Sequence, residues 1–343
     1  LTESSAGAPI YAEWYYGPQK RNLISYKYAV KKLKGYFQDA FVIANYQNIE
    51  ESRISRKFKS NNKDSRIEKV NVLGINADFL HSDASGDLHL GIESYTDFVN
   101  STAHRTNIST GALSAITTRY SDGPTRMGYH AIYAQHTKYL NNHLILNDGI
   151  RFNIVSMNAQ FKDTSLMHFP FTEAKQTYGA FTGNIGLAYN GEKGYRVAFG
   201  LSSGFKAPNV DDLTKVFDTK TGYVVVPNAD LKPEYTYNTE LNISRTMPTY
   251  TWGASVFYTL FKNAAVVDKF TFNGQPKIIY QGILSDVYAP QNKASAVVYG
   301  FNVNGKVEIL YNTSIAATYT YTKGTYDDGA SAMPLDHIPP TYG

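Results

Sequence analysis

The 343-residue sequence predicts an all-β protein, an antiparallel transmembrane β-barrel, and this prediction rests on three observations. Extended segments alternate between apolar and polar residues, as a wall between lipid and a polar lumen requires. Short and long connections between these segments alternate along the chain, which is typical of an outer-membrane barrel with short turns at one end and long loops at the other. Tyr, Phe and Trp total 48 residues, of which 28 are Tyr. Tyr suits a membrane interface because its ring is apolar and its hydroxyl group can be hydrated.

About twelve strands are expected. In chain order they are 19–30, 36–49, 66–82, 86–98, 128–139, 143–158, 178–190, 193–206, 235–246, 250–263, 294–310 and 312–323. A soluble sandwich or propeller would also alternate, but its strands average about five or six residues. Most of the expected strands are close to or above the roughly 9–11 residues with which a tilted strand crosses a bilayer, and this length favours the membrane barrel.

The connections fall into two classes. Short turns are expected at 31–36, 82–86, 139–143, 190–194, 246–249 and 310–312. Long loops are expected at about 50–65, 99–127, 159–177, 207–234, 264–293 and 323–340. The densest basic cluster, within 50–66, is interpreted as part of a solvated loop.

The segment 194–206 shows the alternation most strictly, with Tyr195, Val197 and Phe199 on one face and Arg196 and Ala198 on the other. It also contains a G-x-S-x-G pattern at 200–204. A hydrolase elbow needs a strand, a sharp turn and a helix at this motif. Because the pattern lies inside an unbroken alternating strand, we interpret it as small residues on a lumen face.

Composition and spacing exclude several classes of protein. A net charge of +4, scattered along the chain, argues against a nucleic-acid partner, and the absence of cysteine excludes disulfides and thiolate metal sites. No run approaches the ~20 apolar residues of a membrane-spanning helix. No composition shift divides residues 1–343, so a single domain is expected. No nucleophile, base and acid converge and no metal-ligand spacing occurs, so we expect no enzyme activity, metal or cofactor.

Two motifs flank the predicted loop 207–234. The first is Phe205, Lys206, Ala207 and Pro208; the second is Asn228, Ala229, Asp230, Leu231, Lys232, Pro233 and Glu234. Together with Asp212-Leu213 they resemble the paired F-[RK]-A-P and N-P-[DN]-L-[KR]-P-E boxes of TonB-dependent outer-membrane receptors, with Ala229 where Pro is usual. The segments 12–19 (AEWYYGPQ) and 334–343 (PLDHIPPTYG) resemble members of this family from Bacteroidetes-type bacteria.

The resemblance implies a receptor in a Gram-negative outer membrane that binds a scarce ligand in its outside loops and imports it with energy from TonB. It also implies a 22-stranded barrel with a plugged lumen. Residues 1–343 contain no plug, no TonB contact segment and no closing strands, so we expect a partial barrel, roughly strands six to seventeen. Its partners would be membrane lipid, the ligand, and the TonB complex through an N-terminal region that the sequence lacks.

The ligand is expected to be a ferric siderophore or another iron chelate. Haem is less favoured because residues 209–227 contain no histidine, whereas haem receptors of this type often carry one there. A cobalamin receptor and a passive substrate-specific porin stay open as alternatives. Aromatic and cationic groups suit anionic chelates, and the candidate contacts are Trp14, Tyr15, Tyr16, Arg53, Arg56, Lys57, Phe217 and Tyr223.

Overall fold

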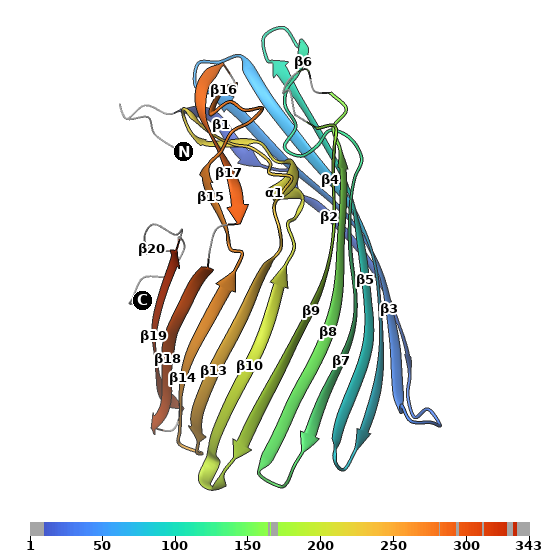
Figure 1. Cartoon of the computed structure of the whole chain (residues 1–343), viewed down its shortest axis with the longest axis vertical. Helices are drawn as coiled ribbons and strands as arrows, with labels where there is room; N and C mark the ends of the chain where they lie inside the picture. The colour runs from blue at the N-terminus through green and yellow to red at the C-terminus, as the bar shows by residue number, and fades with distance from the viewer. Residues whose placement is uncertain are drawn as a thin grey trace.

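Most of the chain forms one antiparallel sheet (Figure 1). The structure is a computed structural model that describes residues 10–163, 165, 171–280, 282–292, 295–310, 312–327 and 332–334. Twelve long strands follow one another in sequence order across the sheet. Short turns join them at one end, the turn end, and longer segments join them at the other, the loop end.

The twelve long strands match the twelve predicted from the sequence. They are β2 (Lys20–Val30), β3 (Asp39–Lys57), β4 (Asn62–Asp83), β5 (Gly86–Asn107), β7 (Thr125–Tyr139), β8 (Leu144–Gln160), β9 (Glu173–Asn190), β10 (Tyr195–Lys206), β13 (Glu234–Thr246), β14 (Tyr250–Lys262), β18 (Ser295–Leu310) and β19 (Thr313–Asp327). The G-x-S-x-G pattern lies within β10, as predicted.

The predicted boundaries are wrong at the loop end. The segment 50–65 is no irregular loop, because β3 runs to Lys57 and β4 starts at Asn62. Likewise β5 continues to Asn107, and its residues 104–106 pair with the short β6 (Leu113–Ala115). Beyond the bilayer both faces of a strand meet water, so the apolar alternation ends while the pairing of the backbone continues.

The first strand is divided into two parts. β1 (Tyr11–Tyr16) pairs with the loop-end half of β3, and β2 pairs with its turn-end half. A cis peptide bond at Gly17-Pro18 separates the two. The aromatic residues 14–16, expected in an outside loop, are therefore held in a strand.

An apolar face and a polar face run across the whole sheet. One row of the apolar face crosses six strands without a register shift: Leu187, Phe199, Leu241, Val256, Phe301 and Tyr321. Phe199 is 45% and Val256 52% exposed. Large apolar side chains with this exposure are typical of the lipid-facing wall of a membrane barrel. The polar face carries charges, including a salt bridge of 3.1 Å between Arg151 and Glu93.

A second, five-stranded sheet lies at the loop end (Figure 1). It consists of β11 (Phe217–Lys220), β12 (Tyr223–Val225), β15 (Ala265–Lys269), β16 (Lys277–Tyr280) and β17 (Ile283–Asn292). The predicted loops 207–234 and 264–293 are thus partly ordered as strands, and β12 pairs with β17 in parallel. Their apolar residues, among them Val224, Val226 and Val287, form a buried core of their own.

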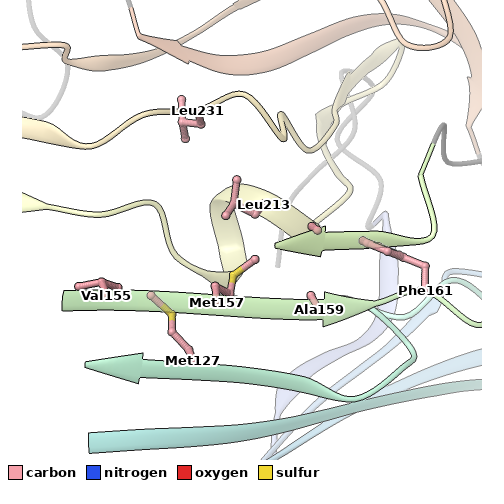
Figure 2. Close-up of a cluster of buried hydrophobic side chains, with 8 residues drawn as sticks. Met127, Val155, Met157, Ala159, Phe161, Leu213 and Leu231 are labelled. Carbon is pink, nitrogen blue, oxygen red and sulfur yellow. The ribbon is translucent and has the colours of Figure 1, made fainter. Parts of the chain in front are cut away.

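The main buried cluster joins the connection after β10 to the polar face of the large sheet (Figure 2). It contains Met127, Val155, Met157, Ala159, Phe161, Ala174, Leu213 and Leu231. Leu213 belongs to the short helix α1 (Val210–Thr214) and is 0% exposed. The long connection therefore folds back onto the wall and does not project freely into solvent.

The remaining short elements are η1 (Glu192–Gly194) in a turn and β20 (Ala332–Pro334) beside β19. In η1, Gly194 has a φ of +75°, and a Cβ there would lie 1.9 Å from the carbonyl oxygen of Thr246, so the turn requires glycine. No helix in the described part of the chain is long and apolar enough to cross a membrane. The motif at 334–343 lies outside the described residues except for Pro334.

Candidate functional site

The loop end of the polar face carries an aromatic and basic group. Tyr16 lies opposite Arg53 in the register, and the guanidinium carbon of Arg53 lies 5.0 Å from the centroid of the Tyr16 ring. Trp14 and Tyr16 share this face, and their rings meet edge to face with centroids 5.1 Å apart. Both rings are about half exposed, Trp14 to 56% and Tyr16 to 51%. They are open to contact with a bound molecule.

On the opposite face of β1, Glu13 pairs with two basic side chains. Glu13 accepts from Arg56 Nε at 2.7 Å with one oxygen and lies 2.7 Å from Lys63 Nζ with the other. Hydrogen bonds from Lys63 and Arg56 lower the pKa of the Glu13 carboxyl. Tyr15 lies on the same face, with its ring centroid 5.7 Å from Lys63 Nζ. Of the predicted contacts, Arg56 is therefore already neutralised by a carboxylate.

The predicted contacts do not form one group. Lys57 is exposed at the end of β3, opposite Tyr11. Phe217 and Tyr223 lie on the five-stranded sheet, where Tyr223 stacks on Tyr288 with centroids 4.0 Å apart. In the described residues no hydrogen bond, ion pair or ring contact joins these two to β1. Trp14, Tyr16 and Arg53 are thus the predicted residues that the structure brings together on the polar face.

The two sequence motifs hold the long connection in place. The first ends β10 and the second starts β13, and a salt bridge of 3.0 Å between Lys206 and Glu234 joins them. Asn209 caps α1: its side chain accepts from the Asp212 N–H at 3.1 Å, and Asp212 accepts from the Asn209 N–H at 3.0 Å. Pro208 is buried between strand and helix, where its missing N–H ends the ladder.

The second motif ties this connection to β17. Asn228 donates to the carbonyl oxygen of Pro290 at 2.8 Å. The backbone N–H of Lys232 donates to Asn292 Oδ1 at 2.6 Å, and Asn292 donates back to the Lys232 carbonyl oxygen at 2.9 Å. The side chain of Leu231 is buried in the main cluster. The other motif residues are Phe205 and Ala207, half-buried against that cluster, Pro233, buried, and Asp230, exposed.

A buried polar chain crosses the polar face beside this connection, and the sequence analysis did not predict it. Glu68 is 5% exposed, and Ser101 donates to its carboxyl group at 3.4 Å. The backbone N–H of Tyr120 donates to the Ser101 hydroxyl at 3.4 Å, and Arg66 Nε donates to the Thr117 carbonyl oxygen at 3.2 Å. Burial raises the pKa of Glu68 to about 7. Only the strand register, which places Ser101 opposite Glu68, could have indicated this contact.

The chain of contacts reaches α1 through Asp211. This carboxylate lies 2.9 Å from Lys215 Nζ and 3.6 Å from Arg119. Burial opposes its charge, but hydrogen bonds from Tyr120 and Lys215 outweigh burial and lower the pKa of Asp211. Burial and the hydrogen bond to Asp211 raise the pKa of the Tyr120 hydroxyl. Segment 117–121 is thus clamped between β4, β5 and α1.

A pocket of about 510 Å³ opens on the polar face next to the start of the connection. Charged residues of both signs line it, namely Glu93, Asp97, Arg151 and Lys206. Among the described residues no three His, Asp or Glu side chains gather as a metal site. The site as a whole offers rings and guanidinium groups, which suit binding of an anionic molecule.

Comparison with known proteins identifies the fold. The family model described as "TonB dependent receptor-like, beta-barrel" matches residues 3–343. No curated protein sequence matches the chain. Among solved structures, the copper transporter OprC superposes with a TM-score of 0.75 and 12% identity, covering 96% of this chain and 49% of that one.

Two further solved structures are similar in fold. The ferric yersiniabactin uptake receptor FyuA from Yersinia pestis has a TM-score of 0.61 and 17% identity, with 91% of this chain and 44% of that chain covered. The siderophore receptor PiuA from Acinetobacter baumannii has a TM-score of 0.65 and 12% identity, with 92% and 49% covered. The chain spans about half the length of these structures.

Proposed function

Because this chain belongs to the family of TonB-dependent receptor β-barrels, we propose that it imports a ferric siderophore or another anionic iron chelate across a bacterial outer membrane. The observation that supports this ligand class is the group of Trp14, Tyr16 and Arg53 on the polar face at the loop end. Aromatic rings and a guanidinium group bind large delocalised anions without needing a metal site of their own.

The two faces of the sheet support the membrane placement. The apolar face contacts lipid and the polar face lines the passage for the ligand. Members of the family are outer-membrane proteins of Gram-negative bacteria. We place the loop end outside the cell, where the ligand is captured, and the turn end in the periplasm.

The twelve long strands would be part of a larger barrel of about 22 strands that also holds a plug. In the described residues β2 pairs only with β3, and β19 pairs with β18 and the three-residue β20. Free strand edges in lipid are costly because no water can satisfy their backbone groups. Further strands of the same protein would cover these edges, and an N-terminal region would contact the TonB complex.

The alternatives to an iron chelate are haem, cobalamin and passive diffusion. A haem receptor is less favoured because residues 209–227 contain no histidine. A passive porin would be expected to lack the paired motifs at 205–208 and 228–234 and the very long loops. We therefore keep the iron chelate as the proposed cargo, with haem, cobalamin and passive diffusion as the outcomes against it.

Direct binding tests the proposal. The full-length receptor would be purified in detergent and titrated with ferric citrate, a ferric catecholate, a ferric hydroxamate, haem and cobalamin, following the fluorescence of Trp14. We expect saturable binding of a ferric chelate, weakened at least tenfold by Tyr16→Ala. Trp252→Phe, which removes the other tryptophan of residues 1–343, is the optical control. Binding of haem or cobalamin alone would overturn the iron-chelate proposal.

A further inference from the structure

Two like-charged pairs face each other on the polar face of the hairpin formed by β3 and β4. The register places Glu51 opposite Glu68 and, two residues further toward the loop end, Arg53 opposite Arg66. Directly opposed like charges in neighbouring strands are unfavourable. The glutamate pair and the arginine pair are opposite in charge and offset each other, so the need of the arginines for a further anion depends on the charge of Glu51 and Glu68.

No carboxylate of the described residues forms an ion pair with Arg53. The Nε of Arg53 is buried without a hydrogen-bond partner in the same part of the chain. Its guanidinium group is instead held against the ring of Tyr16. A buried donor without a partner is unfavourable, so the site is polar and unsatisfied as it stands.

A third arginine approaches from the segment 117–121. Arg66 donates to the carbonyl oxygen of Thr117, which fixes this segment over β4. Arg119 follows, with its side chain 13% exposed and stacked on Tyr120 at 5.1 Å. Its one carboxylate contact in the described residues is Asp211 at 3.6 Å, and its Nε is likewise buried without a partner. Among the described residues, Arg53 and Arg66 thus have no ion pair, and Arg119 has one long ion pair.

The nearby glutamates compensate only in part. Glu51 is exposed to solvent, and Glu68 is buried with a pKa of about 7, so it carries little charge in mildly acidic solution. Asp211 is shared between Arg119 and Lys215. The groups that face Glu68 are therefore Glu51 from β3, Arg66 from β4, Ser101 from β5, Tyr120, and Asp211 from α1.

We propose that Arg53, Arg66 and Arg119, the arginine triad, bind a compact oxyanion such as a carboxylate or phosphate group. Guanidinium groups present planar pairs of N–H donors that match such groups. The proposed function is required only for the further step that this oxyanion is part of the imported chelate, next to Trp14 and Tyr16. Anion binding itself requires no iron and no TonB.

The test is a titration of the full-length receptor with citrate and with inorganic phosphate, measured by calorimetry. We expect saturable binding of at least one anion, weakened at least tenfold by Arg53→Gln and by Arg119→Gln. Arg126→Gln is the matched control, because Arg126 also stacks on an aromatic ring, Phe98 at 5.5 Å, but lies on the apolar face. Arg53→Lys keeps the charge and should lose only part of the affinity.

Two results would overturn the inference. One is the absence of saturable anion binding to a receptor whose heat-dependent gel shift shows an intact barrel. The other is an equal loss of affinity in Arg126→Gln. If anion binding follows the triad while no iron chelate binds, the proposed cargo fails and the anion site stands.

Discussion

Leu213 and Leu231 lie in the same buried cluster, one from α1 and the other from the motif before β13, with exposures of 0% and 2%. They seat the long connection on Met127 and Met157 of the wall (Figure 2). The connection is consequently part of the folded barrel mouth, and its position is set by apolar packing.

Leu213→Ala should weaken the packing of the long connection on the wall. Removing a fully buried leucine side chain costs about 2–5 kcal/mol, and the loss should appear locally as cleavage of residues 209–227 by protease. Leu284→Ala is the matched control, since Leu284 is 63% exposed on the five-stranded sheet. Equal protease resistance of the two variants would contradict the seating role.

Lys206 and Glu234 should contribute unequally to the junction of β10 and β13. Lys206 is 60% exposed in its side chain, so Lys206→Ala should cost at most about 1 kcal/mol. Glu234 also accepts the backbone N–H of Ala265 at 2.5 Å, so Glu234→Ala should cost more by leaving that donor unpaired. Amide exchange at Ala265 measures this directly, and equal exchange rates in the two variants would refute the difference.

The stability of the mouth should depend on pH through Glu68. Its pKa in the folded protein, about 7, lies above the ordinary 4.5, so the protonated form is favoured on folding. The contribution of Glu68 protonation to the free energy of unfolding is fully present below pH 4.5 and is lost as the pH rises through 7. This contribution is roughly 3 kcal/mol.

Glu68→Gln should remove this pH dependence, because the amide keeps the size of the side chain and cannot ionise. Denaturant midpoints between pH 5 and pH 8 would be compared with those of Glu192→Gln in a turn. Anion affinity at the arginine triad should also fall above pH 7 in the parent and less so in Glu68→Gln. A pH profile unchanged by Glu68→Gln would exclude this residue as its source.

The membrane assignment of the apolar face predicts that a charge is tolerated differently at two positions of β10 that face opposite sides of the sheet. Phe199→Lys places a charge on the lipid face and should destabilise the barrel by about 2–4 kcal/mol if it lies near the bilayer midplane. Ser202→Lys places the same charge on the polar face and should change stability much less. Refolding into lipid vesicles under denaturant measures both, and similar costs would contradict the assignment of the faces.

The sequence predicted the strands well where lipid dictates the pattern, and poorly beyond it. In β10 alternation alone identified the strand, because each apolar side chain must face lipid. In the loop-end half of β3 the side chains of Arg53 and Arg56 alternate between two polar surroundings, so no periodicity marks the strand. The Bacteroidetes-type origin and the partial barrel stay predictions.

The candidate site was predictable only in part, for a related reason. The aromatic run at 14–16 indicated a contact surface by composition, and Arg53 was named with it. Glu68, Ser101 and Arg119 were missed because their significance depends on cross-strand register and on a segment folded over the sheet. Residues far apart in sequence, each unremarkable alone, become a site only when the register is known.

Energy-dependent uptake tests the central claim most directly. Cells expressing the full-length receptor would be supplied with a radiolabelled ferric chelate that the purified receptor binds, in the presence and absence of TonB. We predict that uptake disappears without TonB while binding at the cell surface remains. Uptake that continues at the same rate without TonB would show a passive pore and contradict the account.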